Sequence, residues 1–147
     1  METRLASPPD ADSLAALHGE SFDTARWNSG QFAQSLKLPT TKGWIAQDQC
    51  EMLGLILCQI TDDESEILTF CVSPRVRRRG VGSALLATAM HTARSLNSKR
   101  FFLDVLENNT AALALYKKAG FEPTGRRLNY YTHHGDTRDA LILSLTL

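Results

Sequence analysis

Residues 1–147 are predicted to form a single domain of the α/β (α+β) class, with about four helices on a mixed, mostly antiparallel sheet of six or seven strands. Apolar runs joined by short polar turns in the first half of the chain are typical of antiparallel strands. Later strands are separated by segments with helical spacing of apolar residues, which favours a parallel connection. A chain of 147 residues, 43% of them hydrophobic, has the size and composition of one globular domain.

The first part of the chain is predicted to hold one strand and two helices. Residues 3–6 form the strand, and the first helix begins near Pro8, because proline is favoured in the first turn. Asn28, followed three residues later by Gln31, matches the capping box of a second helix that runs to Leu36.

The central part is predicted to hold three antiparallel strands, a helix and a fourth strand. Residues 42–47, 50–60 and 65–72 follow one another across short polar turns, which allows only antiparallel neighbours. A helix begins after Gly80, where the apolar residues change to helical spacing. We expect residues 99–105 to form a strand parallel to residues 65–72, since a helix lies between the two.

The last part is predicted to hold one helix and two strands. Asn109 is a helix cap, residues 110–119 form the helix, and Gly120 ends it. Residues 121–130 and 138–146 then form a hairpin around a Thr-His-His-Gly-Asp turn.

Cysteine and histidine residues do not suggest a disulfide or a metal site. Cys50, Cys58 and Cys71 are odd in number and lack zinc-ligand spacing, so we expect reduced residues in the core. His133 and His134 lie in the final turn, where we expect them to be exposed and to bind no metal because no third ligand is in sight.

Charge is distributed unevenly although the net charge is zero. Residues 1–72 carry eleven acidic and four basic side chains, and residues 73–100 carry seven basic and no acidic ones. A basic centre suits a polyanionic ligand, and an acidic first half suits a cationic partner. Nucleic acid is the alternative ligand, but the basic segment is short and has no aromatic residues for base stacking, so no direct nucleic-acid binding is expected. The sequence has no secretory signal and no stretch long enough to span a membrane, which predicts a cytoplasmic protein.

The most informative segment joins a buried strand to a helix through a basic, glycine-containing loop. The strand over residues 67–72 is followed by three arginines, Arg77, Arg78 and Arg79, and then by Gly80 and Gly82. The first amides of a helix have no internal partner and carry the positive end of the helix dipole. Glycines let an anion approach these amides, and guanidinium groups match phosphate oxygens. The sequence therefore predicts an anion site.

The spacing of this loop distinguishes between phosphate-binding motifs. It lacks the Lys-Ser/Thr pair of nucleoside-triphosphate loops, and Leu85 stands where the dinucleotide motif has its third glycine. The pattern Arg77-x-x-Gly80-x-Gly82 resembles the pyrophosphate-binding signature of the GNAT superfamily of N-acetyltransferases. This resemblance implies acetyl-CoA as the acetyl donor, bound without a metal, and a GNAT fold whose central parallel strands splay apart at the donor site.

A second motif narrows the resemblance. The order Asn-x-x-Ala-x-x-Leu-Tyr-x-x-x-Gly-Phe holds over residues 109–121, and Arg-Arg-Leu-Asn-Tyr-Tyr follows at residues 126–131. Together they are similar to the ribosomal-protein-alanine N-acetyltransferases of bacteria, over most of the chain after Trp27. The donor-binding positions that this resemblance implies are Phe70, Cys71 and Val72 by their backbone, Arg77, Arg78, Arg79, Gly80, Val81, Gly82 and Ser83 at the pyrophosphate, and Asn109 beside the thioester.

The same resemblance implies the catalytic residues. Tyr116 is implied as the general acid that protonates the leaving thiolate. Asp104 stands where this branch has a glutamate as general base, and it is one methylene shorter. The base is therefore Asp104, directly or through a water, or else Glu66 or Glu107. The demand is modest, because about a tenth of an α-amine is already neutral at pH 7.

The implied acceptor is the N-terminal alanine of a basic ribosomal protein, attacked directly through a tetrahedral intermediate. Trp27, Glu66, Tyr130 and Tyr131 are the candidate acceptor-binding residues, although Trp27 could equally fill the core. Other readings remain open at this point: a transferase for peptide lysines or small amines, and a non-catalytic acyl-CoA-binding module.

Overall fold

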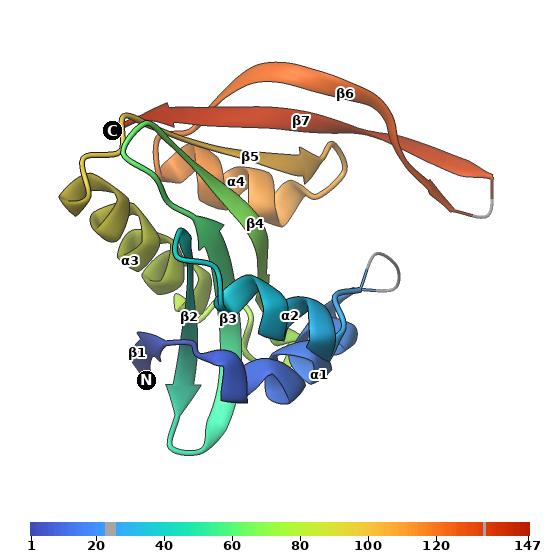
Figure 1. Cartoon of the computed structure of the whole chain (residues 1–147). Helices are drawn as coiled ribbons and strands as arrows, with labels where there is room; N and C mark the ends of the chain where they lie inside the picture. Colours follow the sequence, from blue (N-terminus) through green and yellow to red (C-terminus); the bar gives the residue numbers. More distant parts are fainter. Residues whose placement is uncertain (23–25, 134) are drawn as a thin grey trace.

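The structure is a computed structural model that describes residues 1–22, 26–133 and 135–147. Within these residues, one seven-stranded sheet has the order β1-β2-β3-β4-β5-β7-β6 (Figure 1). Every neighbouring pair is antiparallel except β4 and β5, which confirms the predicted mixed sheet and its parallel central pair. The strands are β1 (Glu2–Leu5), β2 (Thr41–Asp48), β3 (Glu51–Gln59), β4 (Glu64–Val72), β5 (Arg100–Leu106), β6 (Glu122–His133) and β7 (Asp136–Thr146).

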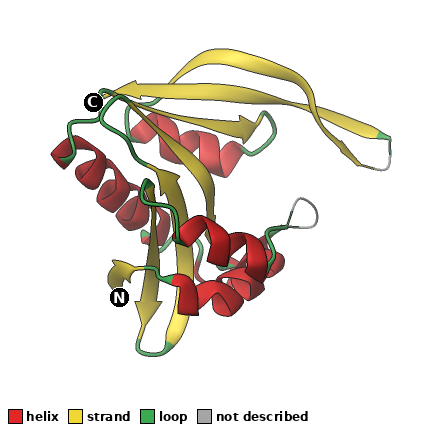
Figure 2. Cartoon of the chain, viewed as in Figure 1, coloured by secondary structure: helices red, strands yellow, loops and turns green. Residues whose placement is uncertain are grey.

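Helices cover both faces of the sheet (Figures 1 and 2). Helices α1 (Ala11–Ser21) and α2 (Ser29–Leu36) lie on one face, which we call the α1/α2 face. Helices α3 (Val81–Ser95) and α4 (Thr110–Lys118) lie on the other, the α3/α4 face. Short 3-10 turns over Pro8–Asp10 and Pro74–Val76 precede α1 and the loop before α3.

Each face of the sheet has its own hydrophobic core. Leu14 of α1, Phe32 of α2 and Ile45 of β2 are buried together on the α1/α2 face. On the α3/α4 face, Leu85 and Phe101 belong to a larger cluster that joins α3 and α4 to the strands. The sheet is therefore the shared middle layer, and any opening between its strands lies between two rigid cores.

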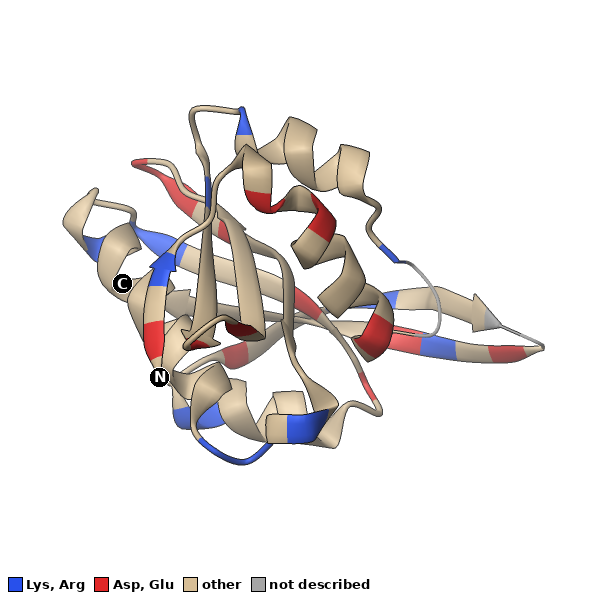
Figure 3. Ribbon diagram, turned by 90° about the horizontal axis from the view of Figure 1, so that it is seen from below, with Lys and Arg blue, Asp and Glu red and all other residues tan. Residues whose placement is uncertain are grey.

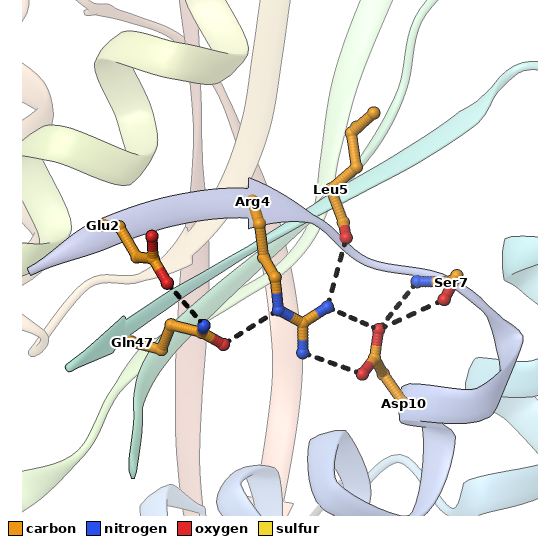
Figure 4. A network of polar contacts seen from close by, with 6 residues as sticks. All are labelled: Glu2, Arg4, Leu5, Ser7, Asp10 and Gln47. Atoms are coloured by element: carbon orange, nitrogen blue, oxygen red, sulfur yellow. Dashed lines mark hydrogen bonds and ion pairs between the residues drawn. The ribbon is translucent and has the colours of Figure 1, made fainter. Parts of the chain in front are cut away.

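The edge strand β1 is fixed by polar contacts (Figure 4). The Arg4 guanidinium forms an ion pair with the Asp10 carboxylate at 2.9 Å and donates to Gln47 Oε1 at 2.8 Å. Gln47 in turn donates to Glu2 at 2.7 Å, and the Ser7 amide donates to Asp10 at 2.9 Å. These contacts connect β1 to β2 and to the turn before α1.

Strands β4 and β5 pair over a short length only. Glu64–Glu66 of β4 pair with Arg100–Phe102 of β5, and no later residue of either strand pairs with the other. Beyond that point β4 contains one extra residue, Leu68, between the residues that pair with Leu57 and Cys58 of β3. Such a bulge bends a strand and increases its twist. The bend directs the end of β4 away from β5 and opens the sheet at its centre, which is the predicted splay.

Strands β6 and β7 form a long hairpin that extends beyond the body of the molecule (Figure 1). Its register shifts between Arg127 and Tyr131, where three residues of β6 face Asp139 of β7. Asn129, in the middle of this bulge, has a φ of 54°, and its amide donates to Asp139 Oδ1 at 3.0 Å. The side chain of Asp139 thus supplies the partner that the ladder lacks here.

Most predicted elements agree with the structure to within a few residues. The capping box of Asn28 and Gln31 is present, with the Gln31 amide 2.9 Å from Asn28 Oδ1. The predicted five-residue turn of the last hairpin is wrong, because Thr132 pairs with Thr137 and the strands continue into it. Backbone pairing between β6 and β7 extends the strands into the residues whose composition suggests a turn. The predicted exposure of His133 and His134 lies outside the side chains that the structure describes.

The cysteine prediction holds for two residues of three. Cys58 and Cys71 are buried and reduced, whereas Cys50 is exposed in the turn between β2 and β3. Cys50 follows two polar residues at the end of a hairpin, where the chain turns in solvent. None of the helices in the described part of the chain combines the length and apolar character that crossing a bilayer requires.

Candidate active site

The opening between β4 and β5 exposes backbone groups of β4. The Ser73 amide donates to the Leu53 carbonyl at 2.8 Å, which fixes the hydrogen-bonding phase of the β3–β4 ladder. Because the two kinds of pair alternate along an antiparallel ladder, Cys71 directs its backbone groups to β3, whereas Phe70 and Val72 direct theirs into the opening. Of the three predicted backbone positions, two therefore face the space where an extended ligand could pair.

A concave loop of unpaired amides lies at the end of β4. Helix α3 begins its hydrogen bonding with the Ala84 amide and the Gly80 carbonyl at 3.0 Å, so the amides of residues 81–83 have no partner within the helix. Arg78 has a φ of 66° and Gly80 a φ of 81°. Left-handed residues in such a loop turn successive amides toward one side and make a concavity that suits an anion.

The loop is also basic and accessible. Arg77, Arg78 and Arg79 are all exposed and have no carboxylate within 4.0 Å among the described residues, in contrast with Arg75, which pairs with Glu51 at 2.9 Å. Acidic and basic positions lie on many elements (Figure 3), but residues 73–100 contain no acidic side chain to neutralise these arginines. The site therefore has the amides, the charge and the access that a pyrophosphate requires.

Gly82 and Asn109 border the opening. A Cβ added to Gly82 would lie 3.3 Å from Leu115 Cδ2 and 3.5 Å from Phe70 Cζ, so glycine keeps the first turn of α3 close to β4 and α4. Asn109 caps α4, because its Oδ1 accepts from the Ala112 amide at 3.2 Å. The Asn109 side chain is exposed, and capping uses only its oxygen, so the amide NH₂ group is available to a ligand.

Tyr116 lies on the α3/α4 side of the opening. Its side chain is 6% exposed and packs edge-on against Phe70 at 6.1 Å and Phe121 at 5.7 Å between ring centroids. Burial raises the pKa of the Tyr116 phenol well above its usual value. The hydroxyl therefore stays protonated at neutral pH, as a proton donor must.

Three charged side chains lie together on the α1/α2 side of the opening. Asp104 Oδ2 accepts from Arg127 Nε at 3.0 Å. Glu66 forms no ion pair within the described part of the chain, and its pKa is raised, first by burial and then by the Asp104 carboxylate, while Arg127 acts in the opposite direction. A carboxylate with a raised pKa is a stronger base near neutral pH. This Glu66–Asp104–Arg127 cluster is separated from Tyr116 by the plane of the sheet.

Glu107, the third candidate base, has another set of partners. It forms an ion pair with Arg126 Nη1 at 2.7 Å, and the same nitrogen contacts Asp139 at 2.8 Å. The Asn129 amide and then the Arg126 guanidinium hold the pKa of Asp139 below its usual value. These contacts stabilise the β6 bulge, and they hold the Glu107 carboxylate in an ion pair.

Trp27 contributes to the core and also borders a hollow. Its ring contacts Phe32 at 5.2 Å between centroids, so one part of it packs on the α1/α2 core. It also lines a shallow hollow of about 330 Å³ beside α2, together with Gln31, Gln34 and Leu38. The contact with Phe32 shows the packing role of Trp27, and its role in acceptor binding stays a prediction.

Tyr130 and Tyr131 differ in exposure. The bulge in β6 leaves Tyr130 56% exposed, and Leu128 beside it is 73% exposed. Tyr131 pairs across the hairpin with Arg138 and is partly buried. The projecting hairpin lies on the side of the molecule where α1 ends and α2 begins (Figures 1 and 3).

Sequence reasoning missed two contributors to this site. Arg127 belongs to the Arg-Arg doublet of the second motif, but nothing local connects it with Asp104. His18 of α1 contacts Thr69 of β4, and no periodicity distinguishes it from an ordinary helix residue. Both contacts join residues more than twenty positions apart. The strand register brings Arg127 to Asp104, and the packing of α1 on β4 brings His18 to Thr69.

Comparison with known proteins gives independent information on the family of this chain. The model of the acetyltransferase (GNAT) family matches residues 11–121, which include the basic loop, β5 and α4. The chain belongs to the GNAT family of acetyltransferases. It is therefore an N-acetyltransferase with a GNAT fold, and the donor used by this family is acetyl-CoA.

Individual relatives are similar over nearly the whole chain. The [ribosomal protein bS18]-alanine N-acetyltransferase of Escherichia coli (strain K12) is 31% identical over 144 residues, which cover 97% of each chain. The crystal structure of the ribosomal-protein-S18-alanine N-acetyltransferase from Escherichia coli has a TM-score of 0.89 at 24% identity, covering 99% of this chain and 94% of that one. Arabidopsis thaliana NAA60 in complex with acetyl-CoA has a TM-score of 0.87 at 21% identity, covering 99% and 98%. The two structures establish the shared fold.

Proposed function

We propose that this GNAT enzyme transfers the acetyl group of acetyl-CoA to the N-terminal alanine of a ribosomal protein in the cytoplasm. One observation carries the proposal: the β4–β5 opening has a basic amide loop at one end, Tyr116 on one face and the Glu66–Asp104–Arg127 cluster on the other. The 31% identity to an N-terminal alanine acetyltransferase supports the choice of acceptor.

The donor would occupy the opening along β4. Its pyrophosphate would contact the amides of residues 81–83 and the guanidinium groups of residues 77–79. Its pantetheine arm would pair with the backbone of Phe70 and Val72 as an added strand. Asn109 would contact the donor near the thioester through its free amide group. No metal is needed, since the amide groups and arginines supply the positive charge.

The acceptor would approach from the α1/α2 side. Trp27, Tyr130 and Tyr131 would flank the peptide, and its α-ammonium would enter beside Glu66 and Asp104. We propose that Glu66, directly or through a water, removes the proton, because its raised pKa suits a base and it is not held in an ion pair. Asp104 remains paired with Arg127 and completes the charge cluster.

The amine would then attack the thioester carbonyl directly, through a tetrahedral oxyanion. A backbone amide of β4 that faces the opening can donate to that oxygen. Tyr116 would give its proton to the departing thiolate, since its hydroxyl belongs to the buried face opposite the base. This arrangement transfers one proton on each side of the sheet and requires no covalent acyl-enzyme.

The acceptor class can be tested with synthetic peptides. Initial rates are compared for a basic peptide that begins with alanine and for the same peptide with a blocked N-terminus and free lysines. We expect turnover only on the free N-terminus. Turnover on the blocked peptide alone would assign the enzyme to lysine side chains, and turnover on small amines alone would exclude a peptide acceptor.

Donor binding is tested separately by thermal unfolding. A ligand that binds only the folded state stabilises it by about 2.7 kcal/mol at a hundred times its Kd. We expect acetyl-CoA to raise the Tm more than adenosine diphosphate does, because adenosine diphosphate cannot pair with β4. Equal shifts for the two ligands would contradict the proposed pantetheine contact.

A further inference from the structure

His18 connects the acceptor side of the site to the strand that would bind the donor. Its ring is buried, with 2% of the residue exposed. The Trp27 amide donates to His18 Nδ1 at 3.2 Å, and His18 Nε2 lies 2.8 Å from Thr69 Oγ1. One imidazole therefore bridges the segment before α2 and the bulge of β4.

The protonation of this imidazole follows from its partners. A backbone N–H can only donate, so Nδ1 must carry a lone pair and the proton must be on Nε2. His18 Nε2 then donates to the Thr69 hydroxyl oxygen. Burial supports the same state, because it lowers the pKa of His18 to about 4 and keeps the ring neutral.

The bridge is held in place by aromatic rings. Phe22 lies 4.4 Å from the His18 ring and Phe32 lies 5.8 Å from it, edge-on. Arg26 Nε also donates to the Phe22 carbonyl at 2.6 Å, which adds a second contact between the end of α1 and the segment before Trp27. Rotation of the imidazole would break its hydrogen bonds with the Trp27 amide and Thr69 Oγ1, so the ring has one geometry.

The other end of the bridge lies at a functional position. Thr69 directly follows the extra residue of the β4 bulge and directly precedes Phe70, whose backbone faces the opening. Trp27, at the first end, borders the hollow beside α2. In the proposed complex, where the acceptor lies against Trp27, a shift of either end relative to the other would change the distance between the acceptor and the thioester.

We propose that His18 is a positioning residue, which fixes the Trp27 side of the acceptor cleft against β4 through the hydrogen bonds to the Trp27 amide and Thr69 Oγ1. The proposal rests on the proposed function, because it assigns Trp27 to the acceptor cleft. His18 itself touches neither substrate, and its effect is on acceptor binding rather than on donor binding or the chemical step.

Thr69→Val tests the bridge with little change of shape, because it removes the hydroxyl that His18 contacts. Losing one such hydrogen bond should raise the acceptor KM roughly five- to tenfold, with kcat and the acetyl-CoA Kd changed less than about twofold. Thr69→Ser is the matched control and should restore the acceptor KM. An unchanged acceptor KM in Thr69→Val, or an equal loss of donor affinity, would overturn the positioning role.

Two measurements test, without any enzyme assay, whether His18 bridges the Trp27 amide and Thr69. Nitrogen NMR of the wild-type imidazole should show the proton on Nε2, and hydrogen exchange of the Trp27 amide should be faster in Thr69→Val while that of Ile45 in the core is unchanged. A proton on Nδ1, or unchanged exchange at Trp27, would overturn the bridge. A wild-type enzyme inactive on every peptide would overturn the proposed function and the acceptor role of His18 together, whatever the NMR result.

Discussion

Tyr116 combines packing with an available proton. Phe70 and Phe121 hold its ring, and burial raises the pKa of its phenol, so the hydroxyl can be removed without disturbing the fold. We predict that Tyr116→Phe lowers kcat more than about tenfold, the lower range for loss of a general acid, and leaves the acetyl-CoA Kd nearly unchanged. Steady-state kinetics with calorimetric donor binding measure both. Full activity of Tyr116→Phe would remove the role assigned to this tyrosine.

Glu66 and Asp104 can be separated by the pH dependence of kcat. Glu66→Gln should lower kcat by roughly a hundredfold or more if Glu66 is the base. Asp104→Asn should retain more activity. It removes a negative charge that raises the pKa of Glu66 and frees Arg127, so the pKa of Glu66 falls and the acid limb of kcat moves to lower pH. The opposite ranking of the two variants would make Asp104 the base.

At the scale of the elements, the loop before α3 depends on backbone conformation rather than on space. A Cβ at Gly80 would meet nothing within 4 Å, but the φ of 81° disfavours any other residue. Holding alanine at this left-handed φ costs about 1 to 2 kcal/mol. We predict that the loop of Gly80→Ala relaxes to avoid this cost, and that the acetyl-CoA Kd, measured by calorimetry, rises several-fold.

Gly19→Ala is the matched control for this prediction. Gly19 also has open space around its Cβ position, but it lies within α1 at an ordinary helical φ. Alanine there should be neutral or stabilising by up to about 1 kcal/mol, with unchanged donor affinity. Equal donor affinity in Gly80→Ala and the wild type would show that the left-handed residue is not needed for binding.

At the scale of the whole molecule, two cores meet across a sheet that is open at its centre, and His18 is one contact that holds α1 to β4. Since burial lowers the pKa of His18 from 6.5 to about 4, the unfolded chain binds this proton more readily than the folded one. The contribution of His18 to the free energy of unfolding should therefore be fully present above pH 6.5. It should be lost as the pH decreases toward 4, which lowers the free energy of unfolding by at most roughly 3 kcal/mol.

This acid sensitivity is measured by chemical unfolding between pH 4 and 7. The variant His18→Asn lacks the titrating group, so its unfolding free energy should change less over the same range. The lowered pKa values of Asp10 and Asp139 act below the ordinary carboxylate range, and the raised pKa of Glu66 acts above it, but all three groups are present in both proteins and affect them equally. Parallel curves for the two proteins would mean that His18 is not buried as a neutral ring.

The sequence by itself determined the features that depend on neighbouring residues. The strand, basic loop and helix around Gly80 could be predicted, because the apolar run, the arginines and the glycines that specify them lie within a few positions of one another. The capping box of Asn28 and Gln31 follows from an equally local signal, and the parallel order of β4 and β5 follows from chain connectivity. The second motif, from Asn109 to Tyr131, placed the chain in its family.

The tertiary structure alone decided which of these residues meet. Arg127 reaches Asp104 because β7 lies between β5 and β6 in one register, and a shift of one residue would place the two on opposite faces. The bulge at Leu68 sets the opening and turns Phe70 and Val72 toward it, and no residue type announces a bulge there. Side-chain pairing across a sheet depends on the register of several strands at once. For that reason the partners that support the proposed choice among Glu66, Asp104 and Glu107 are visible only in the folded chain. The contact of His18 with Thr69 likewise depends on how α1 packs on β4.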